Sequence, residues 1–206
     1  FKVIGSSSHR LYTSDTNFIT RDQLLVHGYL DGEEMYFIVN HWPSKRGGEK
    51  RSEPKRIAAA ELTRHLSDSL HKINPKVNVI IMGDLNDNPN AKSIAKTLNA
   101  KGDKSEMKDG DLFNPMWKLY KDGIGSYAYK DSWTLIDNII VSNNLLGNDF
   151  STYKLFATKV FNETFLQQKE GTFKGYPWRM MAGGTYIGGY SDHFPVYIIL
   201  AKTPNQ

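Results

Sequence analysis

The stretch that most constrains the fold is Val77–Pro89, where a run of apolar and β-branched residues ends in a loop of carboxylates and amides. An almost continuous apolar run is typical of a central strand that is covered on both faces. Gly83 is expected to end the strand, and the loop after it carries Asp84 and Asn86. Such loops, at the carboxyl ends of strands, usually hold the site of an α/β sheet. The sequence therefore predicts a central strand that brings Asp84 and Asn86 to one edge of a sheet.

Two interpretations of this loop remain open at this point. Asp84 and Asn86 offer hard oxygen donors two residues apart, and on a tight loop both can face one magnesium ion or one phosphate. The same run of Asp and Asn residues before Pro89 is also typical of a plain Asx turn that closes a strand.

The flanking segments predict a layered α/β domain. A hairpin signal precedes a helical pattern that begins with Ser52 as its cap, repeats apolar residues every fourth position, and ends at Pro75. A shorter helix is expected at Ala91–Leu98. The other expected strands are Phe1–Ile4, Leu24–Leu30, Met35–Trp42, Ser126–Lys130, Leu135–Val141, Thr152–Val160 and Phe194–Leu200. The order hairpin, helix, strand favours strands and helices stacked in layers.

Length and composition narrow the class of protein. The 206 residues suit one domain, expected over residues 1–206, and no linker composition divides them. The formal net charge of +4 suits a polyanionic substrate without requiring one. The chain has no cysteine, so any metal must be held by oxygen and imidazole ligands. No apolar run approaches the roughly 18 residues of a membrane span.

Further polar residues stand at the ends of apolar strands. His41 lies in an Asn-His-Trp loop, and Asp192 and His193 precede the last strand. Asp137 interrupts an apolar strand, where an unpaired charge is costly, so it needs a partner. Each residue also has a plain structural interpretation, as a loop histidine, a turn cap or a carboxylate bound to backbone amides.

Taken together, these motifs resemble the endonuclease/exonuclease/phosphatase superfamily, which includes deoxyribonuclease I, exonuclease III, inositol polyphosphate 5-phosphatases and neutral sphingomyelinases. The matching segments are Asn40–Trp42, Gly83–Asp87, Ile136–Ser142 and Ser191–Pro195. The residues around these segments look most like those of bacterial members of the superfamily. The resemblance implies a four-layer αββα sandwich, with two sheets face to face and helices outside, here expected to lack its first strands.

The resemblance also implies a reaction and its residues. The reaction is hydrolysis of a phosphoester by in-line attack of water, with one or two Mg²⁺ or Mn²⁺ ions. His193 would contact the phosphate or take the proton from water, and Asp137 would orient His193. Asp192 would ligate the metal or its water. Asp84 would activate the water or hold a second metal, and Asn86 would donate to the phosphate.

Weaker analogies concern the early part of the chain. His41 matches the histidine that some nuclease members use as a general acid towards the leaving oxygen. Asp22 would orient His41, while Arg21 and Asn40 would contact the phosphate.

The sequence differs from the family pattern at one point. The principal metal-binding glutamate of the family lies in a segment that would precede Phe1. Glu33 and Glu34 occupy a hairpin turn and are poor substitutes. The resemblance covers this chain but only about the last two-thirds of a family domain. We therefore expect this stretch alone to bind Mg²⁺ weakly and hydrolyse little, and a longer native chain to be active. A start at Phe1 also leaves secretion or a periplasmic location open.

The leading functional hypothesis is a nuclease that acts as a monomer on nucleic acid. Cations after the histidine loop, such as Arg46 and Arg51, could follow a nucleic-acid backbone or could form an ordinary solvated face. The alternatives are a phosphatase or phospholipid hydrolase that acts on a small head group, and a binding module without catalysis. Gly171–Tyr190, rich in glycine and aromatic residues, is expected to be a long loop that faces the substrate.

Overall fold

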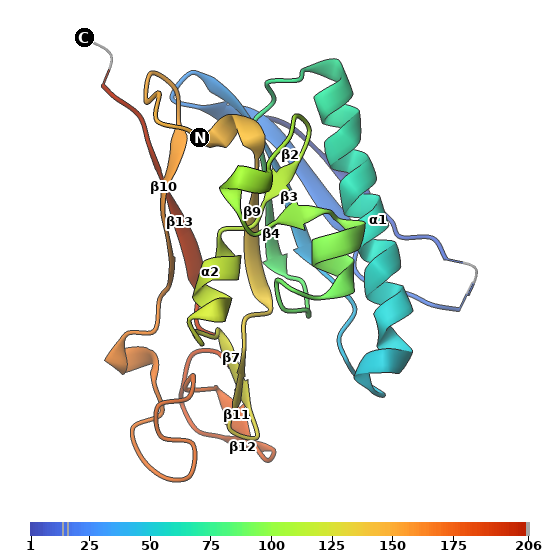
Figure 1. Ribbon diagram of the computed structural model, residues 1–206. Coiled ribbons are helices and arrows are strands. Elements are labelled where there is room, and N and C mark those ends of the chain that lie inside the picture. Colours follow the sequence, from blue (N-terminus) through green and yellow to red (C-terminus); the bar gives the residue numbers. More distant parts are fainter. Residues whose placement is uncertain (14, 16, 205–206) are drawn as a thin grey trace.

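The computed structural model describes residues 1–13, 15 and 17–204, and its main feature is a seven-stranded sheet (Figure 1). In spatial order its strands are β1 (Lys2–His9), β2 (Gln23–Leu30), β3 (Glu33–His41), β4 (Val79–Asp84), β9 (Asp137–Ser142), β6 (Leu112–Phe113) and β5 (Ala100–Lys101). β4 runs parallel to β3 and antiparallel to β9. The predicted central strand is confirmed, because β4 has a neighbour on each side and Val79, Ile80 and Ile81 are buried.

A second, smaller sheet pairs β10 (Lys154–Val160) with β13 (Val196–Ala201) in antiparallel fashion. Two hairpins, β7 (Tyr127–Tyr129) with β8 (Ser132–Thr134) and β11 (Met181–Ala182) with β12 (Thr185–Tyr186), lie near one end of the molecule (Figure 1). The helices are α1 (Glu49–Ile73), α2 (Met116–Lys121), a π-helical turn η1 (Lys92–Thr97), and the 3₁₀ turns η2 (Lys104–Glu106), η3 (Asn143–Leu145) and η4 (Thr164–Leu166).

The two faces of the large sheet belong to different apolar clusters. On one face, Ile38 and Ile81 pack with Leu66 and the other apolar residues that repeat along α1. On the other face, Ile80 and Val141 pack with residues of β10 and β13. Figure 1 accordingly shows α1 on one side of the large sheet and the small sheet on the opposite side.

This arrangement confirms the expected α/β fold, with two sheets face to face and α1 outside the large sheet. Phe156 on β10 is 68% exposed and Ile199 on β13 is 41% exposed. Each strand of the small sheet therefore keeps a large apolar side chain in contact with solvent.

Several element boundaries differ from the sequence-based expectation. β1 continues to His9, because its backbone pairs with β2 along its whole length. α1 begins at Glu49 rather than after Ser52, whose hydroxyl donates to the Gly48 carbonyl 2.8 Å away inside the helix. β9 begins at Asp137, since the Leu135 amide is diverted to the side chain of Asn88.

The strand β4 also continues through Gly83, which was expected to end it. Gly83 has a φ of +135°, and a Cβ at this position would lie 1.9 Å from the carbonyl oxygen of Asn40. Glycine is required here because β3 and β4 approach each other too closely for a side chain. This close approach brings the ends of the two strands together.

Among the described residues, no helix is both long enough and apolar enough to cross a membrane.

Candidate active site

Three neighbouring strands carry one polar residue each at the same edge of the large sheet. The register pairs His41 of β3 with Asp84 of β4, and Asp84 in turn with Asp137 of β9. β4 is parallel to β3, so both strands end at this edge, whereas the antiparallel β9 begins there. Residues far apart in the sequence therefore form one row across three strands.

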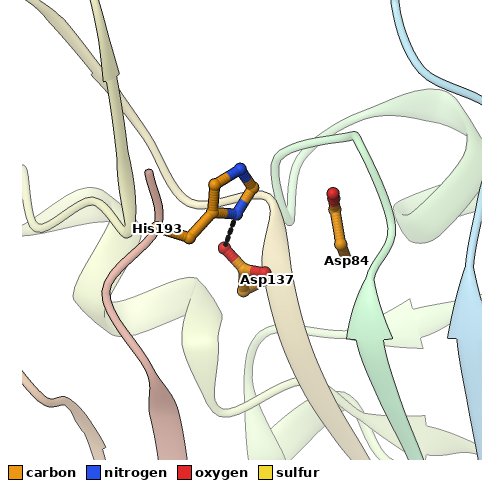
Figure 2. Close-up of side chains that lie close together, drawn as sticks. All are labelled: Asp84, Asp137 and His193. Atoms are coloured by element: carbon orange, nitrogen blue, oxygen red, sulfur yellow. Dashed lines mark hydrogen bonds and ion pairs between the residues drawn. The ribbon is translucent and has the colours of Figure 1, made fainter. Parts of the chain in front are cut away.

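His193 completes this row from the loop before β13. Its Nδ1–H donates to Asp137 Oδ2 at 2.8 Å (Figure 2). The hydroxyl of Ser126 donates to the same oxygen at 2.5 Å. The side chains of His193 and Asp137 are 21% and 16% exposed, so this contact is mostly shielded from water. The costly charge of Asp137 thus has two hydrogen-bond partners, as its position in an apolar strand required.

Asp84 lies across from this pair, on the neighbouring strand (Figure 2). Burial raises the pKa of Asp84, the backbone N–H of Asn86 opposes the rise, and the charge of Asp137 adds to it. The backbone N–H of Asn86 donates to Asp84 Oδ1 at 2.8 Å, and His41 Nε2 lies 3.5 Å from Asp84 Oδ2. One Asp84 oxygen is therefore held by the loop, and the other lies near His41.

The surroundings of His193 favour its protonated form. Burial alone would lower its pKa, but the hydrogen bond to Asp137 and the charges of Asp137, Asp84 and Asp192 outweigh burial, so the pKa of His193 is raised. Because Nδ1 is held by Asp137, the other ring nitrogen, Nε2, is the one available for proton exchange with a bound molecule.

The donor set at this edge fits a divalent cation. One ligand atom each from Asp84, Asp137 and His193 lies within 4.8 Å of the others. Asp84 Oδ2 and Asp137 Oδ1 have no hydrogen bond to the described residues, so two hard carboxylate oxygens remain for a metal, with water in the other positions. Hard oxygen donors are the ligands that Mg²⁺ and Mn²⁺ prefer. Asp192, the expected metal ligand, is exposed beside His193 and is not part of this cluster.

Asn86 and Arg21 lie where a substrate could reach them. Asn86 adopts a left-handed φ of +54°, and its side-chain Nδ2 donates to the Trp42 carbonyl at 2.9 Å. The side-chain oxygen of Asn86 and the second hydrogen on Nδ2 have no partner among the described residues. Arg21 is exposed and lines an open groove that begins at Pro43, two residues beyond His41.

Two expected roles are wrong in this structure. Asn40 is 4% exposed, donates to the Ile38 carbonyl and accepts from the Trp42 indole, so its side chain belongs to the interior and not to a phosphate site. The reason is strand alternation, which directs Asn40 to the face opposite His41. Asp22 accepts a hydrogen bond from Ser8 at 2.8 Å, and no contact with His41 accompanies it in the described residues.

Glu33 and Glu34 lie at the end of β3 opposite to His41. Glu34 is 2.8 Å from His27, and Glu33 accepts from the Tyr153 amide. These partners confirm that the two glutamates do not replace a metal-binding glutamate at the site edge.

Sequence reasoning missed the residues that hold the site together. Ser126 bonds Asp137, and the ring of Tyr127 lies 4.9 Å from the ring of His193. Arg56, which is 1% exposed, donates to Asp87 Oδ2 at 2.7 Å and fixes the loop that carries Asp84. No local signal marks Ser126 or Arg56. Asp87, however, belongs to the polar loop that the sequence singled out.

Comparison with known families gives a match over almost the whole chain. A family model described as the endonuclease/exonuclease/phosphatase family matches residues 1–202. No curated protein matches the sequence.

Solved structures with the same fold include TDP2 proteins and a sphingomyelinase. A truncated TDP2 from Caenorhabditis elegans is 14% identical with a TM-score of 0.58, covering 98% of this chain and 66% of that chain. TDP2 from D. rerio complexed with single strand DNA product is 14% identical with a TM-score of 0.58, covering 98% and 68%. Sphingomyelinase C from Streptomyces griseocarneus is 16% identical with a TM-score of 0.57, covering 98% and 65%.

The chain thus spans about two-thirds of the length of these structures, and at such identities they establish the fold. The deoxyribonuclease I-like fold expected from the motifs is confirmed by these neighbours. The family match over residues 1–202 shows that the chain belongs to the endonuclease/exonuclease/phosphatase family of phosphoester hydrolases.

Proposed function

We propose that this protein is a divalent-metal-dependent phosphodiesterase that hydrolyses nucleic acid. The observation that carries the proposal is the convergence of Asp84, Asp137 and His193 at one sheet edge, with His193 held through Nδ1 and its Nε2 left free. In-line attack of water on phosphorus needs an oriented base and ligands for a metal ion. The imidazole of His193 and the carboxylates beside it can supply both.

Each residue has a role in the proposed reaction. His193 Nε2 takes a proton from the attacking water, whose oxygen forms the new bond to phosphorus as the bond to the leaving oxygen breaks. Asp137 orients His193 and stabilises its positive charge. The side-chain Nδ2 of Asn86 donates its second hydrogen to a phosphoryl oxygen, and His41 gives a proton to the leaving oxygen.

Asp84 and Asp137 would hold the metal. A bound Mg²⁺ or Mn²⁺ would supply positive charge against the negative charge that builds up on the phosphoryl oxygens.

A basic groove next to His41 supports nucleic acid as the substrate. The groove is open, has a volume of about 910 Å³, and lies between the segment around Phe18, the loop after His41 and the start of α1. Its lining includes four cations, Arg21, Arg46, Arg51 and Lys55, and one carboxylate, Asp15. None of the four cations forms an ion pair with a described residue, so all four remain available to phosphates. The single strand DNA product in the D. rerio TDP2 structure agrees with a substrate of this kind.

A panel of substrates tests the proposed function. The full-length protein is incubated with plasmid DNA, RNA, an abasic-site duplex, inositol phosphates and sphingomyelin, each with Mg²⁺ and with a chelator. We expect cleavage of nucleic acid that stops in the chelator. Hydrolysis of sphingomyelin or inositol phosphates without cleavage of any nucleic acid would contradict the proposal, and so would full activity in the chelator.

A further inference from the structure

A second cavity, lined by apolar and aromatic side chains, lies on the His193 side of the site. Its volume is about 500 Å³, and it is enclosed by the β7–β8 hairpin on one side and by the segment between Gln168 and Ile187 on the other. The side chains that give it its character are Tyr129, Lys130, Phe173, Tyr176, Arg179 and Ile187. None of these residues belongs to the catalytic row described above.

The walls of this pocket are attached directly to the segment that carries His193. The carbonyl of Trp178 accepts from the Tyr190 amide at 2.6 Å and from the Ser191 amide at 3.2 Å. Gly189 allows this approach, because a Cβ there would lie 2.2 Å from the same carbonyl oxygen. On the opposite wall, Tyr127 of β7 forms a backbone bridge with His193. Both walls of the pocket are therefore joined through backbone contacts to the segment that carries His193.

The pocket is preformed and does not depend on a ligand to order it. The Tyr176 hydroxyl donates to Asp131 Oδ1 at 2.5 Å, and the Asp131 amide donates to the Tyr176 oxygen at 2.8 Å. The rings of Trp133 and Tyr176 are 5.7 Å apart, and Trp133 also stacks on Phe194 beside His193. These contacts tie the long loop to the hairpin across more than forty positions of sequence.

The chemistry of the lining indicates one class of occupant. The aromatic faces of Phe173, Tyr176 and Tyr129 favour stacking with a flat ring, and Lys130 and Arg179 supply positive charge. No lining residue is acidic. A flat aromatic ring attached to a negative phosphate matches this combination, because the ring can stack and the phosphate can pair with Arg179, whereas an alkyl chain offers neither contact. The volume suits one nucleoside and not a longer segment of polymer.

We infer that this pocket binds the nucleobase next to the scissile phosphate and selects substrates whose phosphate is attached to a nucleoside. The inference rests on the proposed function and extends it, because it assigns the base-binding part of the site to Phe173, Tyr176 and Tyr129. The basic groove beside His41 would then hold the nucleic-acid backbone on the other side of the cleaved bond.

Small chromogenic esters test the pocket without a polymer. The full-length protein with Mg²⁺ is given methyl p-nitrophenyl phosphate and the p-nitrophenyl esters of a deoxynucleoside 5′-phosphate and 3′-phosphate. We expect kcat/KM to be about tenfold higher for one nucleoside ester than for the methyl ester. Phe173→Ala should remove most of this ratio, and Phe173→Tyr, which keeps the ring, should restore it. Phe156→Ala, a similarly exposed phenylalanine on β10, is the matched control and should keep the ratio.

The outcomes separate the pocket from the catalytic proposal. Equal kcat/KM values for the methyl and nucleoside esters, or an unchanged ratio in Phe173→Ala, would overturn the pocket assignment while leaving the phosphodiesterase intact. A hexyl ester that outcompetes the nucleoside esters would overturn it in favour of a lipid chain. If no ester is cleaved, the substrate panel still decides the proposed function, and calorimetric binding of a deoxynucleoside monophosphate decides the pocket. Binding that weakens about tenfold in Phe173→Ala supports the pocket assignment, and binding unaffected by the change refutes it.

Discussion

Asp137 controls the chemistry of His193, because it holds the ring through Nδ1 and leaves Nε2 for the reaction. Asp137→Asn keeps the shape of the side chain but removes its charge, so the histidine loses the support for its protonated form and the proposed metal site loses an anionic ligand. We expect kcat to fall by about two to four orders of magnitude with little change in substrate binding. Steady-state kinetics of Asp137→Asn beside Asp122→Asn, an exposed carboxylate, measure this. A similar small loss in both variants would contradict the role of Asp137.

The raised pKa of His193 also makes a prediction about stability in the absence of metal. Asp137, Asp84 and Asp192 face this imidazole and favour its charged form in the folded state. A folded-state pKa above the ordinary value of 6.5 means that the stabilisation is complete below about pH 6.5 and is lost as the pH rises through the folded-state pKa.

Thermal unfolding from pH 5 to 9 in a chelator, for the wild type and His193→Gln, measures this effect. We expect the wild type to be favoured most at low pH, with the difference shrinking as the pH rises. A difference that grows with pH would contradict the direction of the shift. Added Mg²⁺ should lower the pKa of His193, because a cation at Asp84 and Asp137 opposes its protonation.

At the residue scale, the sequence predicted which residues lie at the site better than it predicted which way their side chains point. His41, Asp84 and His193 were predicted as polar residues at the ends of apolar strands, and Asp137 as a carboxylate inside one. The structure brings all four to one edge. The expected phosphate contact of Asn40 was wrong because Asn40 and His41 were expected to face the same site. Strand alternation places neighbours on opposite faces, so it separates Asn40 from His41.

At the element scale, a buried ion pair joins α1 to the loop that carries Asp84. Arg56 donates to Asp87 at 2.7 Å and to Ser52 at 2.7 Å, and Ser93 of η1 donates to the same Asp87 oxygen at 2.6 Å. Arg56 and Asp87 are almost completely buried, and Lys45 lies 3.6 Å from the other Asp87 oxygen. The helix α1, the turn η1 and the loop that carries Asp84 therefore all contact this buried ion pair.

Removing one partner of this pair should be costly. We expect Arg56→Met to lower the free energy of unfolding by about 3–5 kcal/mol, because it leaves the Asp87 carboxylate buried without its main partner. The matched control is Lys118→Met, which breaks the exposed Lys118–Asp122 pair and should cost at most about 1 kcal/mol. Urea unfolding monitored by fluorescence measures both. Equal small losses would show that the pair does not hold the loop.

The sequence could not reveal this pair, although it predicted the elements around it. Arg56 resembles the other cations along α1, and its partner is 31 positions away. The long apolar strand and the repeat of α1 were predictable because periodicity records burial. The π-helical turn and the start of β9 were not, because side chains such as Asn88 redirect backbone hydrogen bonds there.

At the scale of the whole molecule, the basic groove and the apolar pocket flank the catalytic row from opposite sides. The first begins next to His41, and the second is attached to the segment before His193. Both are built from loops whose folding depends on distant contacts, and for this reason the sequence indicated a substrate-facing role for Gly171–Tyr190 but not a pocket. The layering of the two sheets, in contrast, followed from the motifs.

Nucleic-acid binding should depend on the charge of the groove. In a chelator, the logarithm of the DNA affinity falls linearly with the logarithm of salt concentration, and each lost phosphate contact reduces the slope by about 0.9 on duplex DNA. We expect the double variant Arg46→Gln/Arg51→Gln to reduce the slope by about 2. Lys72→Gln/Lys76→Gln removes the same charge near the other end of α1 and should leave the slope nearly unchanged. Equal slopes for both double variants would exclude the groove as the binding surface.

The most direct measurement of the convergent site is the Mg²⁺-dependent rate of DNA cleavage by His193→Ala in the full-length protein, with His65→Ala on α1 as the matched histidine control. The expected result is a loss of at least about two orders of magnitude in kcat for His193→Ala, with DNA affinity retained, and no loss for His65→Ala. A wild-type rate in His193→Ala would contradict the assignment of the active site to this edge of the sheet.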